Sequence, residues 1–210
     1  MTAFIADLSE QAVVVAMDTL ATEPDGTPAF FTNKAVHLAH IQTLIAGTGC
    51  AGFSNRWALH AIERMQISSI ENLDYHTPDG LRQLWISFCK EYDVPESITT
   101  TVYQFGYSTE KSRMLGFAYR STNDFTSEPR NYGMMVKPEC DVPEEGAFLD
   151  IIQPIMLSQR KIQRGKPKME RIHIGGQCML GVLQPNNYTS LELFRFDDFE
   201  QQLQQVLTKY

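Results

Sequence analysis

The chemistry that the N-terminal segment could support starts from a threonine. Thr2 follows Met1, and a short strand pattern over 1–7 is joined by a three-residue loop to a second strand pattern over 11–18. Because the strands of such a hairpin pair antiparallel, we expect the Thr2 hydroxyl and the Asp18 carboxylate at one end of a sheet. Removal of Met1 would give Thr2 a free amine with a pKa of roughly 7.7–8.0, which can act as a base near neutral pH. A threonine activated by its own amine is a known type of nucleophile.

A second stretch with possible chemistry is TLIAGTGCAG at 43–52. Its glycines, Gly47, Gly49 and Gly52, satisfy G-x-G-x-x-G, the phosphate-binding pattern of dinucleotide-binding enzymes. That fold needs strands alternating with helices in a parallel sheet, and an acid after the next strand. Here several strand patterns follow one another directly, and Glu71 is a weak candidate for the acid. The pattern therefore favours a glycine corner with another role over a nucleotide site.

The elements that must position these residues are strand-rich at both ends of the chain, with helices between. Strand patterns cover 1–7, 11–18, 29–38, 41–46, 98–107, 113–119, 131–136, 178–183 and 190–196. Helical spacing of apolar residues appears at 57–65, 77–92, 146–160 and 199–207. For the second of these helices, Thr77 is expected as the N-cap and Pro78 as the first helical residue.

Short loops between successive strands imply antiparallel pairing. The run 12–17 is apolar on both faces, so this strand must be covered above and below. We therefore predict an α+β fold, a four-layer αββα sandwich of two antiparallel sheets with helices outside, in which residues 1–210 form a single domain. Apolar residues on the helical faces, among them Trp57, Met65 and Trp85, lead us to expect a homo-oligomer.

Composition excludes several function classes. The chain has 210 residues and a formal net charge of -7, so it lacks the basic footprint of a nucleic-acid-binding protein. The basic residues at 160–171 are interpreted as a solvated helix end and loop. No apolar run is long enough to span a membrane and no signal peptide is recognisable, so we expect a cytoplasmic protein.

The cysteines and histidines suggest no metal or cofactor. The four cysteines form no C-x-x-C pair and are interpreted as reduced thiols. His37 and His40 lie three apart in a predicted strand, where side chains three positions apart point to opposite faces. We therefore predict no metal site and no cofactor.

The first third of the chain resembles the proteasome β-subunit family of N-terminal nucleophile (Ntn) hydrolases, which includes the bacterial proteasome-related ring proteases. That family begins its mature chain with threonine, places an acid in an A-x-D/E-x-x-x-T context sixteen positions later, and places a lysine sixteen positions after that. Here Thr2 is followed at both spacings by Asp18, within AMDTLAT, and by Lys34, within NKAVHL. The segment TLIAG at 43–47 then matches the family's apolar strand and A-G corner.

The resemblance implies a role for each matched residue. Thr2 would be the nucleophile, and the charge of Lys34 would favour its alkoxide. Asp18 would pair with Lys34 and hold it in place. The Gly47 N–H would face the oxyanion of the tetrahedral intermediate, a contact that contributes about 3 kcal/mol.

Three further residues would bind the substrate in this resemblance. Thr22 would hold the substrate backbone as an added strand, and Ile45 would lie at the base of an apolar specificity pocket. Gly49 would leave room for a peptide carbonyl. The substrate would be a peptide or an unfolded protein, processed in a homo-oligomeric ring that could work with a separate unfoldase.

The sequence also departs from the active family. No G-S-G-like motif is found at 131–138, and no D-x-x-S follows the third predicted helix at 165–169. Met1, if retained, would leave the Thr2 nitrogen as an amide. Two functions therefore stay open: a threonine peptidase, favoured by the set of Thr2, Asp18 and Lys34, and a catalytically inactive ring or scaffold subunit.

Overall fold

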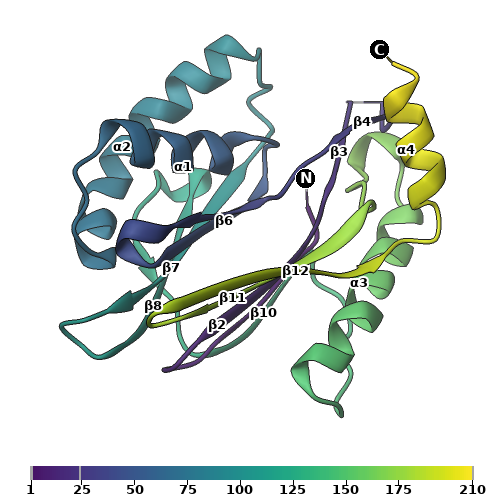
Figure 1. The fold of residues 1–210 in the computed structure, drawn as a ribbon. Helices are drawn as coiled ribbons and strands as arrows, with labels where there is room; N and C mark the ends of the chain where they lie inside the picture. Colours follow the sequence, from purple (N-terminus) through teal and green to yellow (C-terminus); the bar gives the residue numbers. More distant parts are fainter. Residues whose placement is uncertain (1, 24, 210) are drawn as a thin grey trace.

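Two five-stranded antiparallel sheets lie face to face, with helices on both outer faces (Figure 1). The structure is a computed structural model that describes residues 2–23 and 25–209, without the side chain of Met169. A separate two-stranded sheet of β3 (Leu20–Thr22) and β4 (Pro28–Phe31) continues from the end of β2. The layered arrangement confirms the αββα sandwich expected from the strand patterns.

The first sheet has β2 at its centre, in the order β10-β1-β2-β11-β12. Its strands are β1 (Phe4–Leu8), β2 (Val13–Asp18), β10 (Gly133–Lys137), β11 (Gln177–Gln184) and β12 (Asn187–Arg195). In the β1–β2 hairpin Leu8 pairs with Val13 and Phe4 with Met17. This register puts Asp18 at the end of the sheet where β1 begins.

The second sheet has the order β5-β6-β7-β8-β9. Its strands are β5 (Ala35–Leu38), β6 (Thr43–Gly49), β7 (Thr100–Ser108), β8 (Arg113–Arg120) and β9 (Glu128–Pro129). Short 3₁₀ turns occur at η1 (Ala39–Ile41), η2 (Ser121–Asn123) and η3 (Lys168–Glu170). Because β6 is longer than β5, its last residues extend beyond the β5 pairing, which ends at Ala35 and Ala46.

The helices form the outer layers. The helices α1 (Phe53–Arg64) and α2 (Ile70–Glu91) cover the second sheet, and α3 (Phe148–Arg164) and α4 (Phe199–Leu207) lie on the opposite side of the molecule (Figure 1). None of the helices in the described part of the chain is long and apolar enough to cross a membrane.

Three buried apolar clusters correspond to the three interfaces between the four layers. Phe4 stacks on Tyr103 between the sheets, with ring centroids 4.6 Å apart. Ile45 and Trp57 belong to the cluster between the second sheet and its helices. Ile155 and other apolar residues of α3 pack on the first sheet. The apolar character of β2 on both faces thus reflects its position between two of these clusters.

The predicted start of the second helix is wrong. The helix α2 begins at Ile70, and the Ser69 hydroxyl accepts a hydrogen bond from the Asn72 N–H at 3.1 Å. Thr77 lies inside the helix, where its hydroxyl donates to the Leu73 carbonyl at 2.7 Å. The Thr-Pro signal is misleading because Ile70 and Leu73 are fully buried, and this packing extends the helix on the N-terminal side of the proline.

The apolar helix surface expected from the sequence also needs correction. Trp57 is fully buried, and Met65 and Trp85 are partly buried against the same cluster, so none of them offers a free apolar face. The large apolar side chains that are exposed on α1 and α2 are instead Leu59, Ile62, Tyr75 and Ile86. An apolar pattern of period 3.6 identifies one face of a helix but does not show what covers that face. Here α1 and α2 pack on the sheet and on each other, and this packing buries the predicted apolar residues.

Candidate active site

A buried ion pair lies at the end of the first sheet where β1 begins. The Lys34 Nζ is 3.1 Å from Asp18 Oδ2, and the side chains are 10% and 0% exposed. Asp18 ends β2, and Lys34 directly precedes β5 in the other sheet. The pair therefore connects the two sheets, and a charge pair so buried needs further hydrogen bonds to be stable.

The carboxylate of Asp18 obtains these bonds from the backbone. The Ala3 N–H donates to Oδ1 at 2.8 Å, and the Gly175 N–H donates to Oδ2 at 3.3 Å. Together with Lys34, both oxygens of the carboxylate are engaged. Bonds of this kind to a charged acceptor are stronger than bonds between neutral groups and fix its orientation.

The ammonium of Lys34 is held by two partners. Besides Asp18, the Leu20 carbonyl accepts a hydrogen bond from Nζ at 2.7 Å. Burial lowers the pKa of Lys34 below its ordinary value, and the negative charge of Asp18 opposes this effect. A lysine with a lowered pKa gives up its proton more readily than an exposed lysine does.

Thr2 is connected to this site by the peptide bond that it shares with Ala3. It is 8% exposed and directly precedes Ala3, whose N–H is bonded to Asp18. Continuing the β1–β2 register beyond Phe4 and Met17 puts Ala3 opposite Asp18. Thr2, which was expected close to the position opposite Asp18, therefore lies one residue before that position. Met1, whose removal the expectation requires, lies outside the described residues.

Gly47 lies across from Lys34 in the second sheet. Ala35 pairs with Ala46, so the residues that flank this pair, Lys34 and Gly47, are at the same end of β5 and β6. A Cβ on Gly47 would lie 2.4 Å from the Ser54 Cβ, which means that glycine lets α1 pack closely on β6. The G-x-G-x-x-G stretch therefore forms the turn between β6, a strand of an antiparallel sheet, and the helix α1.

The residues expected to bind substrate occupy different environments. Gly49 ends β6 with a φ of 89°, and a Cβ there would lie 2.1 Å from the Thr99 carbonyl oxygen, so only glycine fits. Thr22 ends β3 and is half-buried, beside an irregularity in its pairing with β4. Ile45 is 1% exposed and packs in the cluster under α1.

Sequence reasoning missed two backbone groups of the site, the Leu20 carbonyl and the Gly175 N–H. The adjacent glycines Gly175 and Gly176 are the sequence signal for the second group, because such a pair marks a tight backbone approach. Gly176 has a φ of 77°, and a Cβ on Gly175 would lie 2.7 Å from the Gln202 amide nitrogen. Backbone contacts such as that of Leu20 depend on tertiary packing and leave no residue-type signal.

Cys178 lies beside Asp18 and is not a competing nucleophile. It lies opposite Asp18 in the β2–β11 pairing and is fully buried. Burial, together with the Asp18 charge, raises the pKa of Cys178 to about 12. At neutral pH the thiol is therefore protonated and inert.

The histidines form no metal site with other ligands in the part of the chain that the structure describes. No group of three or more His, Cys, Asp or Glu side chains there could hold a metal ion. His37 stacks on Tyr188 with ring centroids 4.3 Å apart, and burial lowers its pKa. His40 lies in η1.

Solved structures share this fold over the whole chain. The chain superposes on the Gly-1 mutant of Anbu from Hyphomicrobium sp. strain MC1 with a TM-score of 0.63, covering 100% of this chain and 94% of that chain at 13% identity. For Anbu from Yersinia bercovieri, described as an ancestral β-subunit, the TM-score is 0.62 at 7% identity, and coverage is 99% and 92%.

A further structure of Anbu from Hyphomicrobium sp. strain MC1 gives a TM-score of 0.61 at 10% identity, covering 99% and 93% of the two chains. No protein-family model matches the chain, and no curated protein matches it in sequence. At these identities the likeness shows the fold, which is that of Anbu, a proteasome-related protein of the Ntn-hydrolase fold. The structural resemblance expected from the first third of the sequence is thereby confirmed.

Proposed function

Taking the Anbu fold as the premise, we propose that this chain is a threonine-type peptidase in which Thr2 becomes the nucleophile after removal of Met1. The observation that carries the proposal is the buried pair of Asp18 and Lys34, bonded to the N–H of the residue after Thr2. A buried ion pair is weak support for stability, since apolar residues of similar volume often stabilise a fold as well or better. A chemical role accounts for its presence.

In the first step the Thr2 hydroxyl attacks the carbonyl carbon of a peptide bond. The free α-amine of Thr2 takes the hydroxyl proton, and the Lys34 ammonium stabilises the developing alkoxide. The tetrahedral intermediate places its oxyanion toward the Gly47 N–H, at the same end of the strands as Lys34. When the C–N bond breaks, the protonated amine returns the proton to the leaving nitrogen.

In the second step water hydrolyses the ester that remains on Thr2. The α-amine takes a proton from the water, the hydroxide attacks the ester carbonyl, and the Thr2 oxygen leaves with a proton. Asp18 does not exchange a proton in this scheme. It orients Lys34 and balances its charge.

The substrate backbone is proposed to bind as an extended strand beside the last residues of β6. Residues 47–49 extend beyond the β5 pairing, so on that side the described part of the sheet leaves backbone groups for a peptide. Thr22 on β3 would hold the other edge of the peptide, and Gly49 would accommodate a peptide carbonyl. Ile45 would form the base of the specificity pocket.

We further propose a single domain over residues 1–210 that assembles into a homo-oligomeric ring in the cytoplasm and acts on peptides or unfolded proteins. The exposed apolar side chains of α1 and α2, including Tyr75 at 80% and Ile86 at 72% exposure, support self-association. A separate unfoldase would deliver folded substrates to such a ring.

The test is to compare Thr2→Ala with Thr2→Ser in cleavage of a fluorogenic peptide that has an apolar residue before the cut. Intact-mass measurement first establishes whether Met1 is removed. We expect Thr2→Ala to lose at least about a thousandfold in rate, because removing a nucleophile typically costs several powers of ten. Thr2→Ser retains a hydroxyl beside the amine and should keep part of the activity.

The matched control is Arg113→Gln, at the exposed start of β8, which should leave the rate unchanged. The rate should rise with pH through the titration of the α-amine, because only its neutral form takes a proton. An assembled protein that has lost Met1 and is still inert would reject the peptidase. The alternative, a catalytically inactive ring or scaffold subunit, is favoured by the missing downstream serines and would then replace it.

A further inference from the structure

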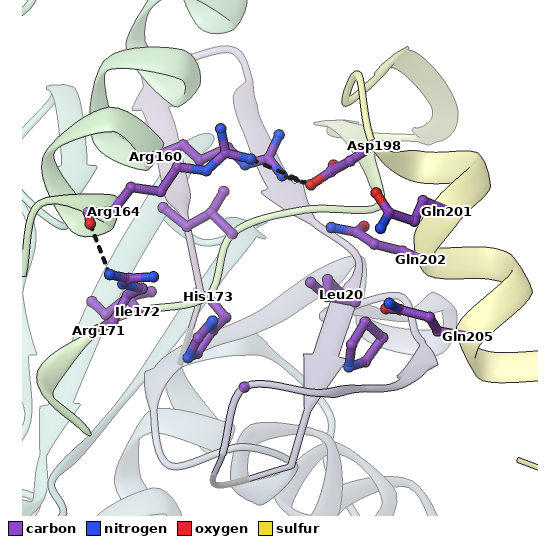
Figure 2. Close-up of a pocket in the computed structure, with 13 residues that line it drawn as sticks. Leu20, Arg160, Arg164, Arg171, Ile172, His173, Asp198, Gln201, Gln202 and Gln205 are labelled. Carbon is purple, nitrogen blue, oxygen red and sulfur yellow. Dashed lines mark hydrogen bonds and ion pairs between the residues drawn. The ribbon is translucent and has the colours of Figure 1, made fainter. Parts of the chain in front are cut away.

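A cationic pocket lies on the α3 and α4 side of the molecule. It has a volume of about 230 Å³ and is enclosed by side chains from α3, from α4 and from the segment 171–174, with Leu20 and Gly26 on the β3–β4 side (Figure 2). A second cavity of about 360 Å³ adjoins it and shares Gly26, Arg171, His173 and Gln205. We refer to the two together as the α3–α4 pocket.

The charge of the pocket is opposite to that of the protein. Its described lining contains four cationic side chains, Arg160, Arg164, Lys168 and Arg171, and two acidic ones, Asp25 and Asp198. The lining therefore carries an excess of two positive charges, which falls to one when Asp197, the second carboxylate paired with Arg160, is counted, whereas the whole chain carries a formal net charge of -7. Positive charges gathered in a concave site raise the local concentration of anions, even on a protein that is acidic overall.

Arg171, like Lys168, is a cation of the pocket lining that no carboxylate among the described residues pairs with. Its Nη2 donates to the carbonyls of Arg164 and Lys166 at 2.8 and 3.0 Å, and it forms no ion pair with any carboxylate among the described residues. Its Nε is buried without a hydrogen-bond partner among them. The nearby His173 has a lowered pKa because of burial and of the Arg171 charge, in agreement with a positive potential here.

Asp198, the N-cap residue of α4, is already engaged by two arginines of α3. Arg160 contacts Asp198 and is 2.7 Å from Asp197, and Arg164 is 3.3 Å from Asp198. Figure 2 shows the Arg160 contact with Asp198 on one side of the pocket and Arg171 with His173 on the other. Arg160 is 5% exposed, and its Nε has no hydrogen-bond partner among the described residues. Asp198 therefore does not balance Arg171.

We propose that the α3–α4 pocket binds the phosphate group of a small phosphate monoester. Such a group carries a charge of about −1.5 to −2 at neutral pH, opposite in sign to the excess of the lining. Guanidinium groups bind phosphate oxygens with parallel N–H donors, and the amides of Gln201 and Gln205 supply neutral donors on the α4 side.

The ligand would lie close to the candidate active site without being part of it. Leu20 lines the pocket, and its carbonyl accepts the hydrogen bond from Lys34. The proposal does not depend on peptidase activity, because it rests on the charge and lining of a different cavity. It also applies if the chain is a scaffold subunit.

The test is calorimetric titration of the full-length protein with inorganic phosphate and with glycerol phosphate, in a buffer of about 150 mM chloride that screens weak surface binding. We expect saturable binding with a Kd below about 10 mM for at least one of the two, and binding about tenfold weaker in Arg171→Gln. Arg113→Gln, which removes an exposed charge on β8, is the matched control and should bind like the unaltered protein.

A second variant guards against misfolding of Arg171→Gln. Gln205→Glu adds a carboxylate on the exposed surface of α4 that lines both cavities, so it should fold normally and also weaken phosphate binding. A hexaglutamate peptide serves as a third ligand. The proposal is overturned if neither phosphate saturates, if both pocket variants bind as the unaltered protein does, or if only the acidic peptide binds, which would assign the pocket to a protein segment.

Discussion

The Asp18–Lys34 pair and the α3–α4 pocket are two charged regions that share Leu20 but differ in how their charges are balanced. At the pair, one carboxylate faces one ammonium, and two backbone N–H groups and one carbonyl complete the set. Among the described residues that line the pocket, two acids face four cations, and Arg171 donates only to backbone carbonyls. The first region is closed and electrically balanced, and the second is open and has an excess of positive charge.

This difference agrees with the two functions proposed for these regions. A closed pair keeps a fixed geometry and a lowered lysine pKa, which suits a group that stabilises charge during a reaction. An open excess of one sign needs a partner from solution, which suits a binding site. If the balance of charge, rather than its presence, separates the two regions, removing one charge should destabilise the closed pair more than the open pocket.

The largest effect on stability is expected for Asp18→Asn. The substitution keeps the shape but leaves the Lys34 ammonium buried without a counter-ion, which typically destabilises a fold by about 3–5 kcal/mol. Urea denaturation of the variant and of the unaltered protein measures the difference.

The double variant Asp18→Asn/Lys34→Met removes both charges and is the control. It should be more stable than Asp18→Asn alone, because no buried charge remains unpaired. A loss below about 1 kcal/mol in the single variant would mean that the pair is solvated and that the site is not closed.

A smaller effect is expected for Arg160→Met in the pocket. Asp198 keeps its contact with Arg164, and its side chain is 26% exposed, so it is not left as a buried unpaired charge. Methionine can also fill the space over the Phe196 ring, where the guanidinium carbon now lies 4.8 Å from the ring centroid. We expect a loss of about 2 kcal/mol in the same urea experiment. A loss equal to that of Asp18→Asn would erase the distinction between the two regions.

The fold was largely predictable because it depends on local patterns. Alternating and continuous apolar runs located most strands of both sheets, and the direct succession of strands implied antiparallel order. The single strand predicted over 29–38 is wrong, because β4 and β5 are separate strands that belong to different sheets. The start of α2 was not predictable from local signals, since Thr77 and Pro78 look like a helix start and only the burial of Ile70 and Leu73 on the sheet extends the helix. The burial of Trp57 was missed for the same reason.

The candidate site was predictable only where residue types carry information. The residue types and spacing that resemble the proteasome β-subunit family point to Thr2, Asp18 and Lys34. The structure brings Asp18 and Lys34 into contact, and Thr2 directly precedes Ala3, whose N–H is bonded to Asp18. The α3–α4 pocket was not predicted, because its arginines looked like a solvated helix end. Their convergence depends on how the 171–174 segment and α4, which begins only at Phe199, pack against α3, and no local sequence pattern shows this packing.

The pH dependence of stability offers a finer test of the closed pair. Because burial lowers the folded-state pKa of Lys34, the unfolded chain binds the lysine proton more tightly between that pKa and the ordinary value of 10.5. In this window the unfolding free energy should rise with pH, by less than about 1.4 kcal/mol per pH unit for one proton.

The reference for this measurement is Asp18→Asn/Lys34→Met, which lacks the titrating group. Urea denaturation of both proteins at alkaline pH isolates the Lys34 contribution, because the other titrating groups are common to them. A difference that falls as pH rises would show that the lysine pKa is raised in the folded state, and that attraction to Asp18 outweighs burial.

The smallest effect is expected at an exposed ion pair, which completes the comparison. Arg82 is 2.5 Å from Asp79 on the surface of α2 and 2.8 Å from Asp124, and the two acidic side chains are 82% and 78% exposed. Water solvates each of these carboxylates when its partner is removed, so Asp79→Asn should change the unfolding free energy by less than about 1 kcal/mol. The residual effect should fall further in about 1 M salt, where the Debye length is only about 3 Å, whereas the loss caused by Asp18→Asn should remain because the buried pair is shielded from ions. Urea denaturation of both variants at low and high salt tests this, and equal salt sensitivity would show that Asp18 and Lys34 are no more enclosed than a surface pair.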